Sequence, residues 1–190
     1  MVESLMEPEG LARLAELAAV IPADQTIVEI GTHQAANLVN MARAAKQGSG
    51  AHVYGVDPYG AGDIYRDRPH MLERYTPADH QIARDHIRAN HVVRQTTILV
   101  GTSVAVADVY AGPQVGLLVI DGEHRYRSVL ADFHAWWPHL APNAVVAFDD
   151  YGGRVGAEVA NVVDQLWGDL AIDWIEMVGS RMAITRARNA

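Results

Sequence analysis

The stretch from Val115 to Gly152 constrains the fold more than any other part of the chain. It contains two short apolar runs, at 115–120 and 143–148, and aspartate follows each run directly. Such runs are typical of parallel strands that are buried on both faces. Between them, apolar side chains recur at helical spacing and would form one face of a helix. These side chains are Val129, Leu130, Phe133, Trp136, Trp137 and Leu140. The stretch therefore predicts a strand–helix–strand unit.

Four acidic side chains follow the two predicted strands. Asp121 and Glu123 come after the first, and Asp149 and Asp150 come after the second. Because the crossover between parallel strands is right-handed, both strand ends lie at one edge of the sheet, where open α/β sheets bind ligands. Carboxylates crowded there repel one another unless a proton or a cation lies among them.

The crowded carboxylates have a chemical and a structural interpretation. The three aspartates offer the oxygen ligands that Mg²⁺ and similar ions prefer, and Glu123 lies near enough to act as a base. The structural alternative is that Asp121 caps the helix and that Asp149 and Asp150 form a solvated turn.

The remaining sequence repeats the alternation of strand and helix. Predicted strands occupy 26–30, 52–56 and 97–100, predicted helices follow them, and two further strand-like segments at 172–177 and 181–186 form a terminal hairpin. A helical stripe within residues 1–22 is expected to pack on the sheet. We therefore expect one α/β domain over residues 1–190, with a Rossmann-like, doubly wound and mostly parallel sheet that contains one antiparallel strand near the C-terminus.

Two strand ends in the first third of the chain carry residues suited to a nucleotide. Gly31 and Thr32 stand where the first strand turns into a helix, whose N-terminus offers free N–H groups, and His33 follows within reach of a ligand. Asp57 ends the second strand, where a carboxylate can accept two hydrogen bonds from a ribose diol. Gly31 and Asp57 could equally be ordinary turn residues.

Composition excludes several other classes of protein. The formal charge of −8 argues against nonspecific binding to nucleic acid or to an anionic membrane. The chain has no cysteine, so thiolate nucleophiles and cysteine-bound zinc are excluded. Its acidic N-terminus does not resemble a secretory signal, and no apolar run approaches the ~20 residues of a membrane span. We expect a cytoplasmic protein.

Several segments resemble class I S-adenosylmethionine-dependent methyltransferases. They are VEIGTHQAANLVNMA, VYGVDPYG, LLVIDGEHRYRSVLADFHAWWPHLAPNAVVAFDDYG and the terminal hairpin. Within this class, the chain is most similar to the metal-dependent O-methyltransferases related to macrocin O-methyltransferase and to the cephalosporin-hydroxylase group. The resemblance implies a seven-stranded sheet whose last strand is antiparallel.

The resemblance also implies roles for individual residues. Glu29 and Gly31 would border the methionine part of S-adenosylmethionine, Asp57 would hold the ribose, and Ser103 would lie near the adenine. The full predicted cofactor set is Glu29, Gly31, Thr32, His33, Asp57, Ser103 and Asp121. The predicted Mg²⁺ ligands are Asp121, Asp149 and Asp150. Glu123 would be the general base, and His124 would contact the substrate or a metal ligand.

The leading hypothesis is a Mg²⁺-assisted O-methyltransferase that acts on a hydroxylated small molecule, such as a sugar or a natural-product intermediate. A homo-oligomer is compatible with this hypothesis. Two alternatives stay open, a metal-dependent hydrolase and a noncatalytic cofactor-binding protein. The second rests on Ala35, Ala36 and Asn37, where relatives usually carry glycine and Ser/Thr. Residues 59–75 are long for a strand–helix connection and are predicted to form a mobile substrate loop.

Overall fold

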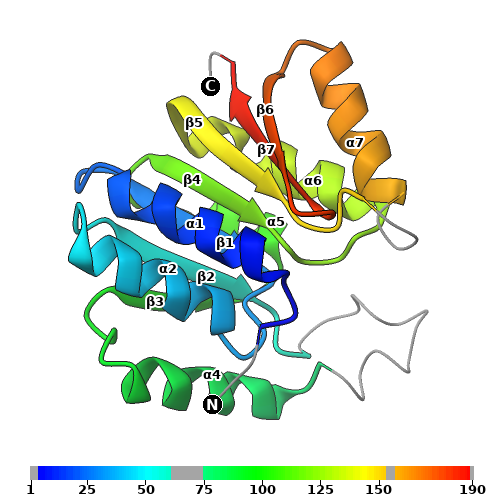
Figure 1. Cartoon of the computed structure of the whole chain (residues 1–190). Coiled ribbons are helices and arrows are strands. Elements are labelled where there is room, and N and C mark those ends of the chain that lie inside the picture. Colours follow the sequence, from blue (N-terminus) through cyan, green and yellow to red (C-terminus); the bar gives the residue numbers. More distant parts are fainter. Residues whose placement is uncertain (1–3, 61–74, 153–156, 189–190) are drawn as a thin grey trace.

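The computed structural model describes residues 4–60, 75–152 and 157–188 (Figure 1). A seven-stranded sheet runs through its centre in the order β3-β2-β1-β4-β5-β7-β6. Its strands are β1 (Thr26–Ile30), β2 (His52–Asp57), β3 (Thr96–Val100), β4 (Val115–Ile120), β5 (Leu140–Phe148), β6 (Ile172–Val178) and β7 (Met182–Ala187). Strands β1 to β5 pair in parallel, and β7 is antiparallel to both of its neighbours. The predicted fold class is confirmed.

Helices cover both faces of the sheet and enclose two apolar cores (Figure 1). They are α1 (Pro8–Val20), α2 (Ala36–Gln47), α4 (Pro77–Ala89), α5 (Ser103–Asp108), α6 (Tyr126–Trp136), α7 (Ala157–Gly168) and the short 3₁₀ helix η1 (Trp137–His139). One core contains side chains of α1, α2 and α4, and the other contains side chains of α5, α6 and α7. Within the described ranges, none of the helices is long and apolar enough to cross a membrane.

Helix α6 ends earlier than its apolar stripe suggested. Pro138 lacks an N–H group and cannot continue the α-helical hydrogen-bond pattern, so the chain passes through η1. Leu140, which the spacing placed on the helix, instead begins β5 and is buried in the core. The predicted strand at 143–148 is therefore the second part of a longer one.

Backbone hydrogen bonds continue beyond the strands and hold their carboxyl ends together. The amide of Gly31 donates to Val56 at 2.9 Å, and that of Asp121 donates to Ile30 at 2.9 Å. Gly31 has a φ of +90°, and a Cβ atom there would lie 2.2 Å from the carbonyl oxygen of Asp121. Only glycine accommodates both the positive φ and this close approach. The loops after β1 and β4 consequently touch at the edge of the sheet.

Replacing Gly31 by alanine tests this contact. Gly31→Ala should lower the free energy of unfolding by more than Gly50→Ala, since Gly50 has a φ of +87° but a Cβ atom added there would meet nothing within 4 Å. Both variants carry backbone strain of about 1–3 kcal/mol, and overpacking should add about 1–3 kcal/mol at Gly31 alone. Urea unfolding measures the difference. Equal losses would contradict a tight contact between the two loops.

Candidate active site

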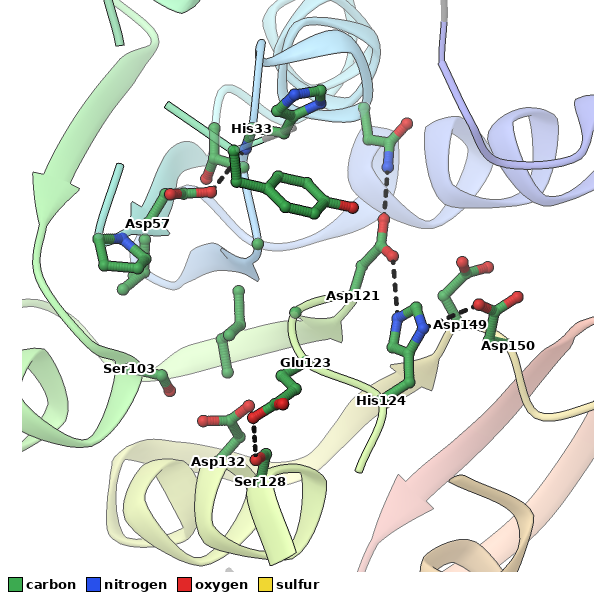
Figure 2. A pocket seen from close by; sticks show the side chains of 18 of the residues that line it. His33, Asp57, Ser103, Asp121, Glu123, His124, Ser128, Asp132, Asp149 and Asp150 are labelled. Carbon is green, nitrogen blue, oxygen red and sulfur yellow. Dashed lines mark hydrogen bonds and ion pairs between the residues drawn. The ribbon is translucent and has the colours of Figure 1, made fainter. Parts of the chain in front are cut away.

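A cavity of about 680 Å³ opens at the carboxyl ends of the parallel strands (Figure 2). Its lining comes from the loops after β1 to β5, from the start of α6, from Arg181 before β7, and from Ser4 and Leu5 near the N-terminus. The predicted site residues that line it are Gly31, Thr32, His33, Asp57, Ser103, Asp121, Glu123, His124, Asp149 and Asp150. The remaining predicted residue, Glu29, is not part of this lining. The strand-end pattern thus brings distant parts of the chain to one cavity.

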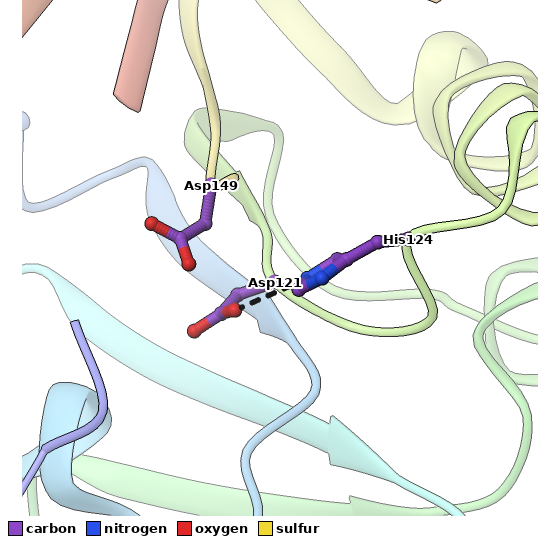
Figure 3. A group of neighbouring side chains, drawn as sticks. All are labelled: Asp121, His124 and Asp149. Atoms are coloured by element: carbon purple, nitrogen blue, oxygen red, sulfur yellow. Dashed lines mark ion pairs between the residues drawn. The ribbon is translucent and has the colours of Figure 1, made fainter. Parts of the chain in front are cut away.

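Asp121, His124 and Asp149 form the part of this cavity best suited to a cation (Figure 3). Each offers one ligand atom, and these atoms lie within 4.8 Å of one another. Burial, and then the charge of Asp121, raises the pKa of Asp149 above its ordinary value. Nε2 of His124 has no hydrogen-bond partner among the described residues and lies 3.6 Å from Oδ1 of Asp121. The predicted repulsion between carboxylates is therefore present at this position.

Asp150 has a different environment from the one its predicted metal role requires. Its carboxylate pairs with the guanidinium of Arg181, which donates from Nε at 2.5 Å, and with Nδ1 of His124 at 2.8 Å. The structure therefore groups His124, in place of Asp150, with the other two predicted ligands. The physical reason is the cation of Arg181, which neutralises Asp150 from the β6–β7 turn.

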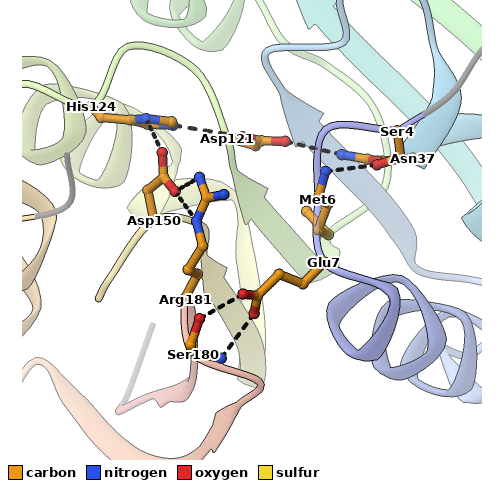
Figure 4. A network of polar contacts seen from close by, with 9 residues as sticks. All are labelled: Ser4, Met6, Glu7, Asn37, Asp121, His124, Asp150, Ser180 and Arg181. Atoms are coloured by element: carbon orange, nitrogen blue, oxygen red, sulfur yellow. Dashed lines mark hydrogen bonds and ion pairs between the residues drawn. The ribbon is translucent and has the colours of Figure 1, made fainter. Parts of the chain in front are cut away.

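A chain of polar contacts surrounds the acidic residues (Figure 4). Asn37 donates to Oδ2 of Asp121 at 2.9 Å, and Ser4 donates to Oδ1 of Asn37 at 2.5 Å. On the other side, Glu7 accepts hydrogen bonds from the backbone and hydroxyl of Ser180, next to Arg181. The segment before α1 and the β6–β7 turn are thus both tied to this end of the cavity.

Sequence reasoning did not assign Ser4, Asn37 or Arg181 to the site. Asn37 departs from the pattern of relatives, and its position six residues after Gly31, at the start of the predicted helix, is a usable signal. Ser4 and Arg181 offered no local signal, because their contacts depend on the packing of the chain ends against the sheet.

The carboxylate of Asp57 lies at another part of the cavity, where two backbone hydrogen bonds fix its position. Its Oδ2 accepts from the backbone of His33 at 2.8 Å, and its Oδ1 accepts from the backbone of Tyr59 at 2.7 Å. Burial raises the pKa of Asp57, and the two backbone hydrogen bonds oppose this effect. Each carboxylate oxygen keeps further acceptor capacity, so the group can still bind two hydroxyls. Next to it, the buried hydroxyl of Thr32 has no hydrogen-bond partner in the described part of the chain.

Glu29 is buried outside the cavity lining, with an exposed fraction of 1%. Burial, and then the charges of Asp121 and Asp57, raises its pKa well above the ordinary range. The uncharged form of the side chain is therefore favoured, with the amide of Asn37 as a weaker opposing influence on the pKa. Neither carboxylate oxygen has a hydrogen-bond partner among the described residues.

Glu123 and His124 have different surroundings, although they are adjacent in sequence. Glu123 accepts a hydrogen bond from Ser128 at 2.6 Å and pairs with Nε of Arg125 at 3.1 Å. It is not part of the group formed by Asp121, His124 and Asp149. Both carboxylate oxygens of Glu123 are therefore engaged, whereas His124 is directed at the acidic group.

Ser103 belongs to a buried array that the sequence did not reveal in full. Its hydroxyl accepts from Nε1 of Trp136 at 3.0 Å, and Asp132 lines the cavity together with Ser103. Burial raises the pKa of Asp132 to about 7. The available signal was an acidic residue on the face of the helix that carries Val129 and Phe133.

The predicted substrate loop lies largely outside the described residues, which omit 61–74. Its described ends lie near the cavity, where Gly60 and Tyr75 contribute to the lining. Tyr59 is buried and stacks on the ring of His80, with ring centroids 4.7 Å apart.

The sheet order and the strand-end cavity define a Rossmann-like α/β protein. Residues 28–151 match the model of the family described as methyltransferase domain. The chain belongs to this family, and the family predicted from the sequence is thereby confirmed.

Known structures share the fold at low sequence identity. The O-methyltransferase NovP is 18% identical, with a TM-score of 0.77 over 100% of this chain and 84% of that chain. The O-methyltransferase TomG from Streptomyces achromogenes, solved in complex with S-adenosylmethionine, is 16% identical, with a TM-score of 0.71 over 98% and 82% of the two chains. A sequence relative, the uncharacterized protein y4gI from Sinorhizobium fredii (strain NBRC 101917 / NGR234), is 39% identical over 79 residues. That match covers 42% of this chain and 8% of the relative.

Replacing Arg181 tests whether Asp150 can serve a cation. Arg181→Gln leaves the carboxylate of Asp150 without its guanidinium partner, so affinity for Mn²⁺ should rise by about two- to fivefold, the range of a partly exposed ion pair. Mn²⁺ is a suitable probe because carboxylates and imidazole both bind it. Calorimetry measures the change, and Arg188→Gln, which breaks the pair with Asp173, is the matched control. Unchanged Mn²⁺ affinity in Arg181→Gln would remove Asp150 from the ligand set.

Proposed function

We propose that the protein is an S-adenosylmethionine-dependent O-methyltransferase that acts on a hydroxylated small molecule with the help of a divalent cation. The observation that carries this proposal is the cavity itself, which combines a carboxylate suited to a ribose, Asp57, with a group suited to a cation. Membership of the methyltransferase domain family supports methyl transfer over the hydrolase alternative. The S-adenosylmethionine in TomG and the O-methyltransferase activity in the name of NovP support the same choice.

The residues after β1 and β2 fit the proposed cofactor. Gly31 has no side chain, so its loop can approach the backbone of Asp121 closely. The buried hydroxyl of Thr32 has no hydrogen-bond partner in the described residues and can bind a ligand. Asp57 would accept the two ribose hydroxyls, with its position fixed by His33 and Tyr59. We place the methionine part of the cofactor beside Gly31 and Thr32, and Glu29 would act indirectly by supporting this loop.

The residues after β4 and β5 fit a divalent cation, with Mg²⁺ as the first choice. Asp121 and Asp149 would hold it, and Asp150 would join them if its carboxylate turned away from Arg181. When bound, a cation would lower the pKa of the acceptor hydroxyl and orient its oxygen toward the methyl donor. The carboxylates would in turn be relieved of the repulsion that raises the pKa of Asp149.

The acceptor hydroxyl must also lose its proton, and we assign its removal to His124. Nδ1 of His124 lies 2.8 Å from the carboxylate of Asp150, which fixes the orientation of the ring as in other catalytic pairs of carboxylate and histidine. Nε2 then keeps the lone pair on the side of Asp121. Glu123 stays the alternative base, but Ser128 and Arg125 already engage its oxygens.

The first experiment measures cofactor binding. S-adenosylhomocysteine should bind to the wild type, and Asp57→Asn should weaken binding by about 1–3 kcal/mol, since the ribose hydroxyls lose a charged acceptor. Calorimetry measures both affinities, and Asp85→Asn, on the exposed face of α4, is the control. Absence of binding to the wild type would sink the proposed function.

The second experiment separates the two candidate bases. Methyl transfer from radiolabelled S-adenosylmethionine to a panel of hydroxylated small molecules would first identify an acceptor, and a chelator should abolish that activity until Mg²⁺ or Mn²⁺ is restored. His124→Gln should then lower turnover by about 10²–10⁴-fold while leaving S-adenosylhomocysteine affinity intact.

Glu123→Gln should have a smaller effect under the same conditions. The assignment of the base would be reversed if Glu123→Gln lost turnover on this scale and His124→Gln did not. Activity that survives the chelator unchanged would exclude the cation from the reaction.

A further inference from the structure

Asp121 is one of the two carboxylates proposed to hold the cation, and an amide that the proposed mechanism does not use is bound to it. Nδ2 of Asn37 donates a hydrogen bond to Oδ2 of Asp121 at 2.9 Å, while Oδ1 of Asp121 lies 3.6 Å from Nε2 of His124 (Figure 4). Asn37 is the second residue of α2 and has an exposed fraction of 8%. The hydrogen bond therefore occupies one oxygen of the carboxylate and leaves the other on the side of His124.

The segment before α1 determines the orientation of this amide. The backbone N–H of Met6 can only donate, and it donates to Oγ of Ser4 at 2.9 Å. The hydroxyl of Ser4 in turn donates its single proton to Oδ1 of Asn37 at 2.5 Å. Because the amide oxygen is thereby occupied as an acceptor, the amide nitrogen is the atom that faces Asp121. The three hydrogen bonds form one chain that begins at a backbone donor and ends at the carboxylate.

The amide of Asn37 holds a carboxylate without neutralising it, which distinguishes it from the guanidinium of Arg181. Arg181 brings a positive charge to Asp150, whereas the donor that Asp121 receives is neutral. The negative charge of Asp121 thus stays available to a cation while the orientation of the carboxylate is fixed. Hydrogen bonds of this kind orient metal ligands, and their removal usually weakens metal binding by about 10–100-fold.

We propose that Asn37 and Ser4 are positioning residues of the cation site, which orient Asp121 so that its Oδ1 meets the cation together with Asp149. The segment before α1 consequently takes part in cation binding, although it lies far in sequence from both carboxylates. This inference rests on the cation of the proposed function. Asn37, whose departure from relatives supported the noncatalytic alternative, thereby gains a role in the proposed reaction.

Calorimetry with Mn²⁺ tests the role of the amide. Asn37→Leu replaces it by an apolar group of similar size and should weaken Mn²⁺ binding by about 10–100-fold, because Asp121 loses the donor that orients it. Asn40→Leu is the matched control, since Asn40 also lies on α2 and donates a hydrogen bond of 2.7 Å, but to the backbone of Leu11. The control should bind Mn²⁺ as the wild type does. Unchanged affinity in Asn37→Leu, or equal losses in the two variants, would overturn the proposal.

Variants of Ser4 test the same chain of hydrogen bonds without altering α2, so they decide the question even if Asn37→Leu does not fold. Ser4→Ala removes the proton that orients the amide and should weaken Mn²⁺ binding by about 2- to 10-fold, the effect of one neutral hydrogen bond. Ser4→Thr keeps the hydroxyl and should restore the affinity of the wild type. Without metal, Ser4→Ala should bind S-adenosylhomocysteine as tightly as the wild type. Equal losses for Mn²⁺ and S-adenosylhomocysteine would indicate a general loosening of the cavity and overturn the proposal.

The outcomes separate this inference from the proposed function. Mn²⁺ binding that is as tight in Ser4→Ala as in the wild type would overturn the positioning role alone and leave the cation site and the function standing. Failure of the wild type itself to bind Mn²⁺ would instead remove the cation from the proposed function, and this measurement needs no variant.

Discussion

The contact between the loops after β1 and β4 is the constraint on which the site depends. Gly31 allows the backbone of Asp121 to approach, and the hydrogen bonds from Gly31 to Val56 and from Asp121 to Ile30 extend the sheet to its edge. Because of this tight edge, the acidic groups at the ends of β2, β4 and β5 share one cavity. The crowding of negative charge is thus a direct consequence of how the parallel strands end.

The protein limits this crowding in three physically different ways. Burial and the charge of Asp121 raise the pKa values of Glu29 and Asp149, which favours the uncharged form of both groups. Asp57 is stabilised by two backbone N–H groups. Asp150 is neutralised by Arg181, a cation supplied by the protein itself. The backbone hydrogen bonds fix the position of the Asp57 carboxylate before a ligand arrives. By contrast, the protonation of Glu29 and Asp149 and the ion pair of Asp150 can change when a cation binds.

The sequence predicted those features of the site that local patterns determine. Asp121 and Asp149 follow apolar runs at a fixed place in a strand–helix–strand unit, so their meeting required only the handedness of the crossover. Arg181 reaches Asp150 across 31 residues, through a hairpin whose position in the sheet no local pattern specifies. Asp132 was hidden because it stands within an otherwise apolar helix face. The strand that carries Glu29 was predicted correctly, but its side chain lies outside the cavity lining. The reason is that a position at a strand end does not determine which way a side chain points.

The two polar parts of the cavity also differ in the kind of selectivity that they can provide. Asp121 and Asp149 offer charged oxygen atoms, which respond to the charge and size of a cation but hardly to the shape of an organic ligand. Asp57 offers directed hydrogen bonds from a fixed position, and a buried polar group left without its partner is penalised strongly. The end of β2 is therefore the part of the cavity suited to a directed polar contact with a ligand. The ends of β4 and β5 instead concentrate the negative charge that the proposed cation would require.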